Sequence, residues 1–202
     1  MKAIFITIFI LLVFSCNHNT NKQQSRIGSY ENIADTCDSG INSIDVLYYN
    51  YIFVNSRARN WDDLQLRIPT FIDDNQKDGI LDAKIEDCNI LKEINKELKQ
   101  VKLYKSQYKI DIRIAATVNY KDGSKKKISI GGIYSTDIAV DDLILDSSGN
   151  KLKYLIKNNI GFYAWMGEKM LSEMNELRDT IYVQRPFVES AYYKLYINKK
   201  GN

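Results

Sequence analysis

The stretch Tyr108–Tyr134, YKIDIRIAATVNYKDGSKKKISIGGIY, decides the fold. From Tyr108 to Tyr120 an apolar residue occupies every second position, which is typical of a β-strand with one face buried. Asp122-Gly123 is a turn sequence, and apolar residues again share one parity between Lys125 and Tyr134. The stretch therefore predicts a β-hairpin.

The apolar pattern also predicts the loop of this hairpin. A two-residue Asp-Gly turn would send the apolar side chains of the two strands to opposite faces of the sheet. A three-residue loop, Lys121–Gly123, with Gly123 in the left-handed conformation, brings them to the same face. We therefore expect the three-residue loop. Its register pairs Ala116 with Ile128, Ile114 with Ile130, and Ile110 with Tyr134.

Residues 83–101 have the apolar spacing of an amphipathic helix, with Asp82 as a plausible N-cap. The apolar residues on its predicted inner face are Cys88, Ile90, Leu91, Ile94, Leu98 and Val101.

The other segments predict shorter elements. These are strands at 44–54, 61–68 and 191–197, a helix that begins near Asn150, and a second short helix at 168–178. For 143–156 a hairpin through 146–150 is the alternative to the helix. The sequence thus predicts an α+β fold: an antiparallel sheet with a central hairpin (108–134), packed against one amphipathic helix (83–101), plus short C-terminal helices.

Composition limits the class of protein. The chain has 202 residues, 45% hydrophobic and 26% charged, which fits one folded domain. A net charge of +3 with mixed signs lacks the basic footprint of a nucleic-acid-binding protein. One His and three Cys exclude most metal centres and catalytic triads, and no phosphate-binding or dinucleotide motif occurs. We expect no cofactor and no nucleic-acid partner.

The N-terminus has the pattern of a secretory signal: Lys2, then the apolar run Ala3–Phe14, then Ser15-Cys16. A run this short does not span a bilayer core, which needs about 20 residues. Val13-Phe14-Ser15-Cys16 resembles the lipobox of bacterial lipoproteins, which are cleaved before a cysteine whose thiol carries a diacylglycerol.

The resemblance implies that residues 1–15 are removed and that Cys16 is the lipidation site. Residues 16–36 are mostly polar without periodicity and predict a flexible tether, and 37–202 form a single domain. The lipid would anchor the protein to a membrane of the bacterial cell envelope. Some lipoprotein families carry acidic residues just after the cysteine as a surface-export signal. No acidic residue lies between Asn17 and Thr20, so the resemblance favours the periplasm-facing side.

Export would place Cys37 and Cys88 where a disulfide can persist. The alternatives stay open: a bridge between the two, or Cys88 as a small core residue and Cys37 as a free thiol.

Asp74, Asp78 and Asp82 partly resemble a calcium-binding loop of the EF-hand or dockerin kind. Position twelve, where the bidentate Glu belongs, is Ile85. We interpret the segment as an acidic turn leading into a helix and predict no metal site.

Phe162, Tyr163 and Trp165 lie in a consecutive apolar run between Gly161 and Gly167. Aromatic residues supply large contact area at binding surfaces, so we predict a partner-binding patch here. The sequence favours a lipid-anchored, non-catalytic binding domain for a protein or peptide partner, for example an immunity-like protector. The alternatives are a small-molecule or glycan receptor with an aromatic cleft, and a glycoside hydrolase that uses two carboxylates about 5–9.5 Å apart.

Overall fold

The computed structural model describes residues 37–49, 57–67, 79–104, 109–179, 183 and 186–201. The strands are β1 (Ile41–Tyr49), β2 (Ile80–Ile85), β3 (Leu103–Tyr104), β4 (Ile112–Tyr120), β5 (Lys125–Gly131), β6 (Asp137–Val140) and β7 (Leu143–Leu145). The helices are α1 (Trp61–Gln65), α2 (Cys88–Gln100), α3 (Asn150–Asn159), α4 (Glu168–Glu173) and α5 (Ala191–Lys200). Short 3₁₀ turns are η1 (Ile133–Ser135), η2 (Ser147–Gly149), η3 (Phe162–Trp165) and η4 (Asn175–Leu177).

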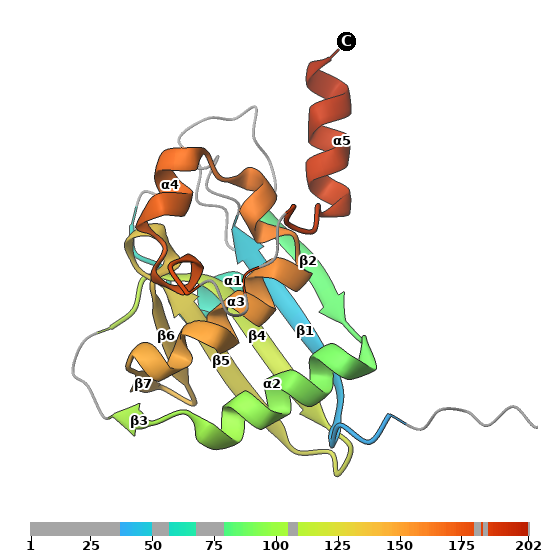
Figure 1. The fold of residues 1–202 in the computed structure, drawn as a ribbon, viewed down its shortest axis with the longest axis vertical. Helices are drawn as coiled ribbons and strands as arrows, with labels where there is room; N and C mark the ends of the chain where they lie inside the picture. The colour runs from blue at the N-terminus through green and yellow to red at the C-terminus, as the bar shows by residue number, and fades with distance from the viewer. Residues whose placement is uncertain are drawn as a thin grey trace, which may run out of the picture. The chain divides into compact units, whose positions relative to one another are not determined.

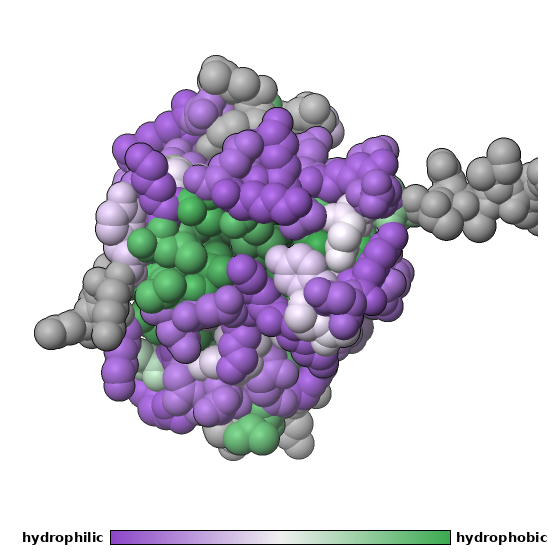
Figure 2. Space-filling view, turned by 90° about the horizontal axis from the view of Figure 1, so that it is seen from below, coloured by the Kyte–Doolittle hydropathy of each residue, from purple (hydrophilic) through white to green (hydrophobic). Residues whose placement is uncertain are grey.

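The seven strands form one antiparallel sheet in the order β2-β1-β4-β5-β6-β7-β3. Figure 1 shows α2 and α3 across one face of this sheet, which we call the front, and α1 behind it. Seen from below, hydrophobic residues occupy the middle of the view, with hydrophilic residues above and below them (Figure 2). The α+β class with an antiparallel sheet is therefore confirmed.

The predicted hairpin is confirmed at the centre of the sheet. Ile114 lies opposite Ile130 and Ala116 opposite Ile128. The amide of Tyr120 donates to the carbonyl of Ser124 at 3.0 Å across a three-residue loop, and Gly123 has φ +84°. The apolar pattern fixed this loop because only this register buries both strands on one face.

At the other end of the hairpin the predicted alternation is wrong. The β4–β5 register shifts between Ile112 and Ile114, so that Ile112 lies opposite Gly131, as in a β-bulge. The extra residue turns Ile112 and Ile110 to the back face, and Tyr134 lies in η1 rather than opposite Ile110. A Cβ on Gly131 would lie 2.0 Å from the carbonyl oxygen of Asp111, so this close approach requires glycine.

The predicted helix 83–101 begins later, at Cys88. Asp87 is its N-cap and accepts hydrogen bonds from the amides of Asn89 and Ile90 at 2.9 and 3.0 Å. Residues 80–85, Asp82 included, form β2 beside β1. Leu81 and Ile85 are four residues apart, a spacing that places two side chains on one side of a helix and also on one face of a strand. The apolar pattern alone therefore could not distinguish a helix from a strand here.

Two predicted strands are helices. Residues 61–65 form α1, which Asn60 caps, and residues 191–200 form α5, which Ser190 caps. In both, a capping side chain outweighs the β-propensity of the aromatic residues that follow. The helix that begins at Asn150 is confirmed, as is the strand 44–54 as far as Tyr49; residues 50–54 lie outside the described residues. The predicted helix 168–178 is divided into α4 and η4.

The main core lies between the front of the sheet and α2, α3 and η3. Its fully buried members include Ile44, Ile94, Ile114, Leu152 and Phe162. A smaller core behind the sheet lies under α1 and contains Tyr49, Leu64, Ile80, Ile112 and Ala115.

A disulfide joins Cys37, just before β1, to Cys88 in the first turn of α2, with the two Cα atoms 5.4 Å apart. Closing a loop with a sequence separation of 51 stabilises the fold by about 4 kcal/mol on the chain-entropy model. The sheet, both cores and this bridge all draw on residues from Cys37 onward, which form a compact unit separate from residues 1–36. Both cores lie within the described part of this unit, and we expect residues 37–202 to fold without residues 1–36.

Candidate functional site: a groove beside Trp61

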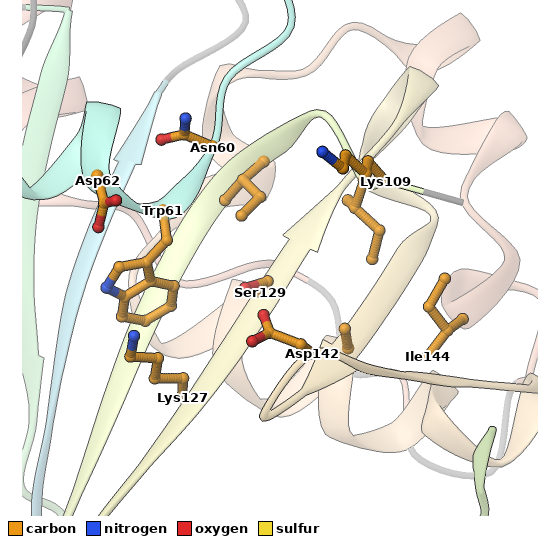
Figure 3. Close-up of a pocket in the computed structure, with 11 residues that line it drawn as sticks. Asn60, Trp61, Asp62, Lys109, Lys127, Ser129, Asp142 and Ile144 are labelled. Atoms are coloured by element: carbon orange, nitrogen blue, oxygen red, sulfur yellow. The ribbon is translucent and has the colours of Figure 1, made fainter. Parts of the chain in front are cut away.

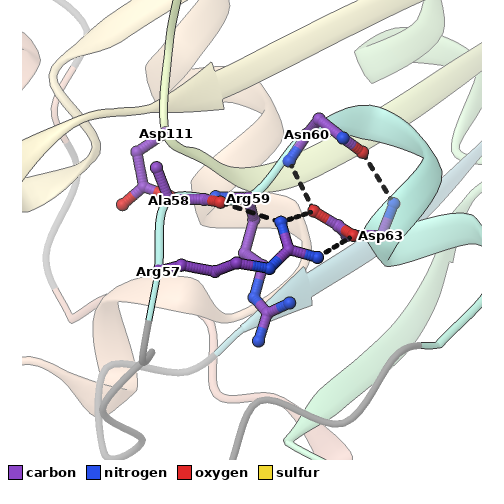
Figure 4. Close-up of polar contacts among 6 residues, drawn as sticks. All are labelled: Arg57, Ala58, Arg59, Asn60, Asp63 and Asp111. Atoms are coloured by element: carbon purple, nitrogen blue, oxygen red, sulfur yellow. Dashed lines mark hydrogen bonds and ion pairs between the residues drawn. The ribbon is translucent and has the colours of Figure 1, made fainter.

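Helix α1 is held at its N-terminus by a reciprocal cap. The Asn60 side chain accepts a hydrogen bond from the amide of Asp63 at 2.9 Å, and the Asp63 carboxylate accepts one from the amide of Asn60 at 3.0 Å. The Arg57 guanidinium binds the same carboxylate with two hydrogen bonds of 2.7 and 2.9 Å (Figure 4). These Arg57 bonds, followed by the Asn60 amide, hold the pKa of Asp63 below its usual value.

The segment before α1 is also tied to the start of β4. The amide of Arg59 donates to Asp111 Oδ1 at 2.7 Å, and the amide of Ile112 donates to the carbonyl of Arg59 at 2.9 Å. Arg113 in turn donates to Asp111 Oδ2 through Nε at 3.1 Å and Nη2 at 2.8 Å. Together these contacts place Trp61, the first residue of α1, against the back of the sheet.

Beside α1, the back of the sheet is hollowed into a groove of about 720 Å³. Figure 3 shows Trp61 and Lys127 at one side of this groove, Ile144 at the other, and Ser129 and Asp142 between them. Its lining residues are Asn60, Trp61, Asp62, Lys109, Ile110, Ile112, Lys127, Ser129, Ala139, Asp142 and Ile144.

The groove depends on two features of the fold. The bulge in β4 turns Ile110 and Ile112 to the back face, and α1 packs on β1 and β4, next to the back of β5, β6 and β7. Apolar side chains from these strands therefore line the groove together with charged side chains of both signs, which are Asp62, Lys109, Lys127 and Asp142.

Two of the charged residues are held in defined positions. Lys127 Nζ lies 5.3 Å from the centre of the Trp61 ring, in a cation–π arrangement. Asp142 follows Asp141 in the turn between β6 and β7, and both residues have positive φ, +66° and +47°. A two-residue loop of type I′ between antiparallel strands requires positive φ at both positions, and Asp adopts this conformation more readily than most other residues with a side chain. The Asp141 carboxylate secures the turn by accepting from the amide of Lys127 at 2.8 Å.

The predicted aromatic patch is wrong. The side chains of Phe162 and Tyr163 are buried, with exposed fractions of 0% and 1%. Gly161, with φ +68°, turns the chain so that η3 faces the core, where Phe162 packs against Tyr48 with ring centres 6.2 Å apart. Trp165 is half-buried against Tyr193 and Tyr196 of α5. Consecutive apolar residues thus mark a 3₁₀ turn inserted into the core.

The other predicted site residues stay separate. Asp82 lies in β2 and forms an ion pair with Arg67 at 2.9 Å, while Asp74, Asp78 and Cys16 lie outside the described residues. Within the described part of the chain, no group of three or more His, Cys, Asp or Glu side chains could hold a metal ion. No helix in that part is both long and apolar enough to cross a membrane.

A second polar cluster is buried between α3 and η4. Lys157 Nζ lies 2.5 Å from Glu176 Oε1, and the Tyr163 hydroxyl donates to the same oxygen at 3.1 Å. Lys153 Nζ lies 3.9 Å from Glu176 Oε2 and donates to the carbonyl of Thr136 at 2.5 Å. Lys157 and Glu176 have no exposed surface, so we assign this cluster to the stability of the helical layer.

Sequence reasoning missed Trp61, Ile110 and Ile112 as site residues. Asn60-x-x-Asp63 is a capping signal that could have identified α1, and the pair Gly131-Gly132 marks the point where β5 meets the bulge. No protein-family model, curated protein or solved structure matches the chain. The geometry of the groove is therefore the basis for its function.

Proposed function

We propose that this chain is a lipid-anchored protein of the bacterial cell envelope whose domain binds a protein or peptide partner, without catalysis, in the groove beside Trp61. The observation that carries the proposal is the groove itself. It combines an apolar wall with charged side chains of both signs on the back of the sheet.

The anchoring part of the proposal rests on the leader and on Cys16. The Cys37–Cys88 disulfide supports it, because such bridges persist in oxidising compartments outside the cytosol. A flexible tether over residues 16–36 would span about 25 Å and keep the domain near the bilayer.

A peptide suits the composition of the groove. Apolar side chains of a peptide can pack on Ile112, Ile144 and the half-buried Trp61 ring. The Lys127 ammonium and the Asp142 carboxylate can bind its carbonyl oxygens and amides. The size, about 720 Å³, lies in the range of sites that bind one ligand or a short peptide segment.

A glycan or other small molecule is the second candidate, and the Trp61 ring is the observation that favours it. The flat face of an indole packs on the C–H face of a sugar, and the neighbouring Asp62 and Asp142 carboxylates can accept hydrogen bonds from hydroxyl groups.

The two tryptophans of the chain allow a matched test. Residues 17–202 serve as bait in envelope extract, beside the variants Trp61→Ala and Trp165→Ala. Each removes one half-buried indole, but only Trp61 lines the groove. We expect the wild type and Trp165→Ala to retain the same protein and Trp61→Ala to lose it, while circular dichroism shows that all three are folded. If Trp61→Ala retains the same envelope protein as the wild type, the partner does not bind in the groove.

The variant Trp165→Phe separates the two ligand classes, because Trp61 is then its only indole. Envelope peptides and oligosaccharides are titrated in turn while Trp61 fluorescence is recorded. A saturable change with peptides supports the first candidate, and one with oligosaccharides alone supports the second.

A further inference from the structure

Helix α5 exposes most of its side chains. Of the seven large apolar side chains that the described residues leave exposed, four lie between Val188 and Ile197. The exposed fractions are 59% for Leu195, 45% for Ile197 and 36% for Tyr192. A ten-residue helix is marginal in water without packing, so this exposed surface indicates a partner outside the described chain.

The start of α5 is firmly attached to the domain. The Trp165 ring lies 5.3 Å from that of Tyr193 and 5.5 Å from that of Tyr196, while the Ser190 hydroxyl caps the helix itself by accepting from the amide of Tyr193 at 3.0 Å. A Cβ on Gly161 would lie 2.2 Å from the amide nitrogen of Ser190, so the chain passes closely here. From this base α5 extends away from the sheet (Figure 1).

The charge of α5 is entirely positive. Its charged residues are Lys194, Lys199 and Lys200, all exposed, and its sequence AYYKLYINKK contains no acidic residue. No ion pair is recorded for these three lysines among the described residues. The helix is therefore complementary to an anionic surface, and repulsion disfavours a second copy of α5 beside it.

The exposed apolar residues lie on two sides of the helix. Leu195 and Ile197 are two positions apart, or about 200° around the axis, so they lie on opposite sides. Tyr192 and Leu195 are three positions apart, so they lie within about 60° of each other and share one side. A helix that lies in the interfacial layer of a bilayer buries one side, and the side that carries Tyr192 and Leu195 suits this position. The interfacial layer also accommodates tyrosine rings at the headgroups and lysines whose ammonium groups reach the phosphates.

We propose that α5 inserts into the interfacial layer of an anionic lipid membrane, as a contact separate from any lipid on Cys16. The expected ligand is an anionic phospholipid surface, with Leu195 and Tyr192 buried on the membrane side of the helix and the lysines beside the phosphates. The inference is independent of the groove and of the anchor, because the test uses protein without either the leader or Cys16.

The test is vesicle flotation of residues 17–202 with phosphatidylcholine alone and with phosphatidylcholine that contains phosphatidylglycerol. We expect flotation with the anionic vesicles, loss of binding as salt screens the lysines, and little binding to phosphatidylcholine. Equal binding to both kinds of vesicle, or no binding by folded protein, would overturn the proposal.

Charge variants give the matched comparison. Changing all three lysines of α5 to Gln should lower partitioning into anionic vesicles about 100-fold, since each lysine near such a surface contributes about fivefold. The control is Lys92→Gln/Lys96→Gln/Lys99→Gln, which removes the same charge from the exposed side of α2. An equal loss in the control would mean that net charge, and not α5, determines binding.

Apolar variants separate insertion from simple attraction. Tyr192→Ser/Leu195→Ser keeps all lysines and should still lower partitioning by tenfold or more, because about two buried side chains are lost. If this variant binds anionic vesicles as tightly as the wild type, α5 does not insert into the membrane. Soluble poly-glutamate serves as a competitor: tight binding to it in the absence of vesicle binding would assign α5 to an acidic protein and overturn the membrane proposal.

Discussion

Lys157 and Glu176 form a fully buried ion pair, with Nζ 2.5 Å from Oε1, that joins α3 to η4. The Tyr163 hydroxyl donates to the same carboxylate oxygen, and the Lys157 ammonium lies 5.4 and 5.7 Å from the ring centres of Phe162 and Tyr163. The polar pair therefore fixes the turn that carries these two aromatic residues into the core. This explains why the predicted binding patch is buried.

Removing one member of this pair should destabilise the domain strongly. Lys157→Met leaves the Glu176 carboxylate buried beside a less effective partner, Lys153, and we expect a loss of about 3–5 kcal/mol in the free energy of unfolding. The double variant Lys157→Met/Glu176→Leu removes both charges and should recover most of that loss. Urea denaturation of the wild type, Lys157→Met, Glu176→Leu and the double variant measures the coupling free energy between the two side chains. A single variant as stable as the wild type would contradict the assignment.

The same lysine makes stability depend on pH. Burial lowers the pKa of Lys157 from 10.5 to about 8 in the folded state. Between these values the unfolded chain keeps a proton that the folded chain has released, so the unfolded state binds more protons and stability rises with pH. Relative to Lys157→Met, the free energy of unfolding of the wild type should rise as the pH increases from about 8 towards 10.5. Chemical denaturation across this window checks the slope, and a flat or falling difference would contradict it.

The hairpin and the class of fold were predictable because they depend on local patterns. Alternation over β4, the position of Gly123 and the parity of Ile128 and Ile130 all specify one register. The back-face groove was not predictable in this way. It requires a bulge at Ile112 that breaks the alternation and a helix at residues 61–65 whose aromatic start favours a strand. Both are set by contacts between distant segments, such as Asp111 with Arg59.

The burial of Phe162 and Tyr163 also could not be predicted from the local sequence. A consecutive apolar run between glycines has the same appearance whether it is exposed or inserted into the core. The partner that decides the outcome, Glu176, is thirteen residues from Tyr163 and was not marked by any motif.

Gly131 should be essential for the bulge that shapes the groove. An alanine here would place its Cβ 2.0 Å from the carbonyl oxygen of Asp111, and the backbone would have to move. We expect Gly131→Ala to destabilise the domain by about 1–3 kcal/mol. Gly167→Ala is the control, because its Cβ would meet no atom within 4 Å and its φ is −74°. Thermal and urea melting of both variants tests the difference, and equal effects would show that the bulge is not the cause.

Asp63 should determine the position of Trp61 at the groove. Asp63→Asn weakens the double hydrogen bond from Arg57 and the reciprocal cap with Asn60, and a lost cap costs about 1–2 kcal/mol. The matched control is Asp62→Asn, which changes the exposed neighbouring carboxylate.

In a Trp165→Phe background, where Trp61 is the only indole, we expect Asp63→Asn to shift the fluorescence maximum to the red as Trp61 becomes more exposed. Because the pKa of Asp63 is lowered in the folded state, its contribution to stability is present above the usual Asp value of 3.8. It should be lost as the pH falls through the lower folded value. The Trp165→Phe protein with Asp63 intact should therefore show the same red shift under acid at a pH below 3.8, and Asp63→Asn in this background should not respond there. If Asp62→Asn shifts the fluorescence maximum as far as Asp63→Asn does, the position of Trp61 depends on the net charge of α1 and not on the contacts of Asp63.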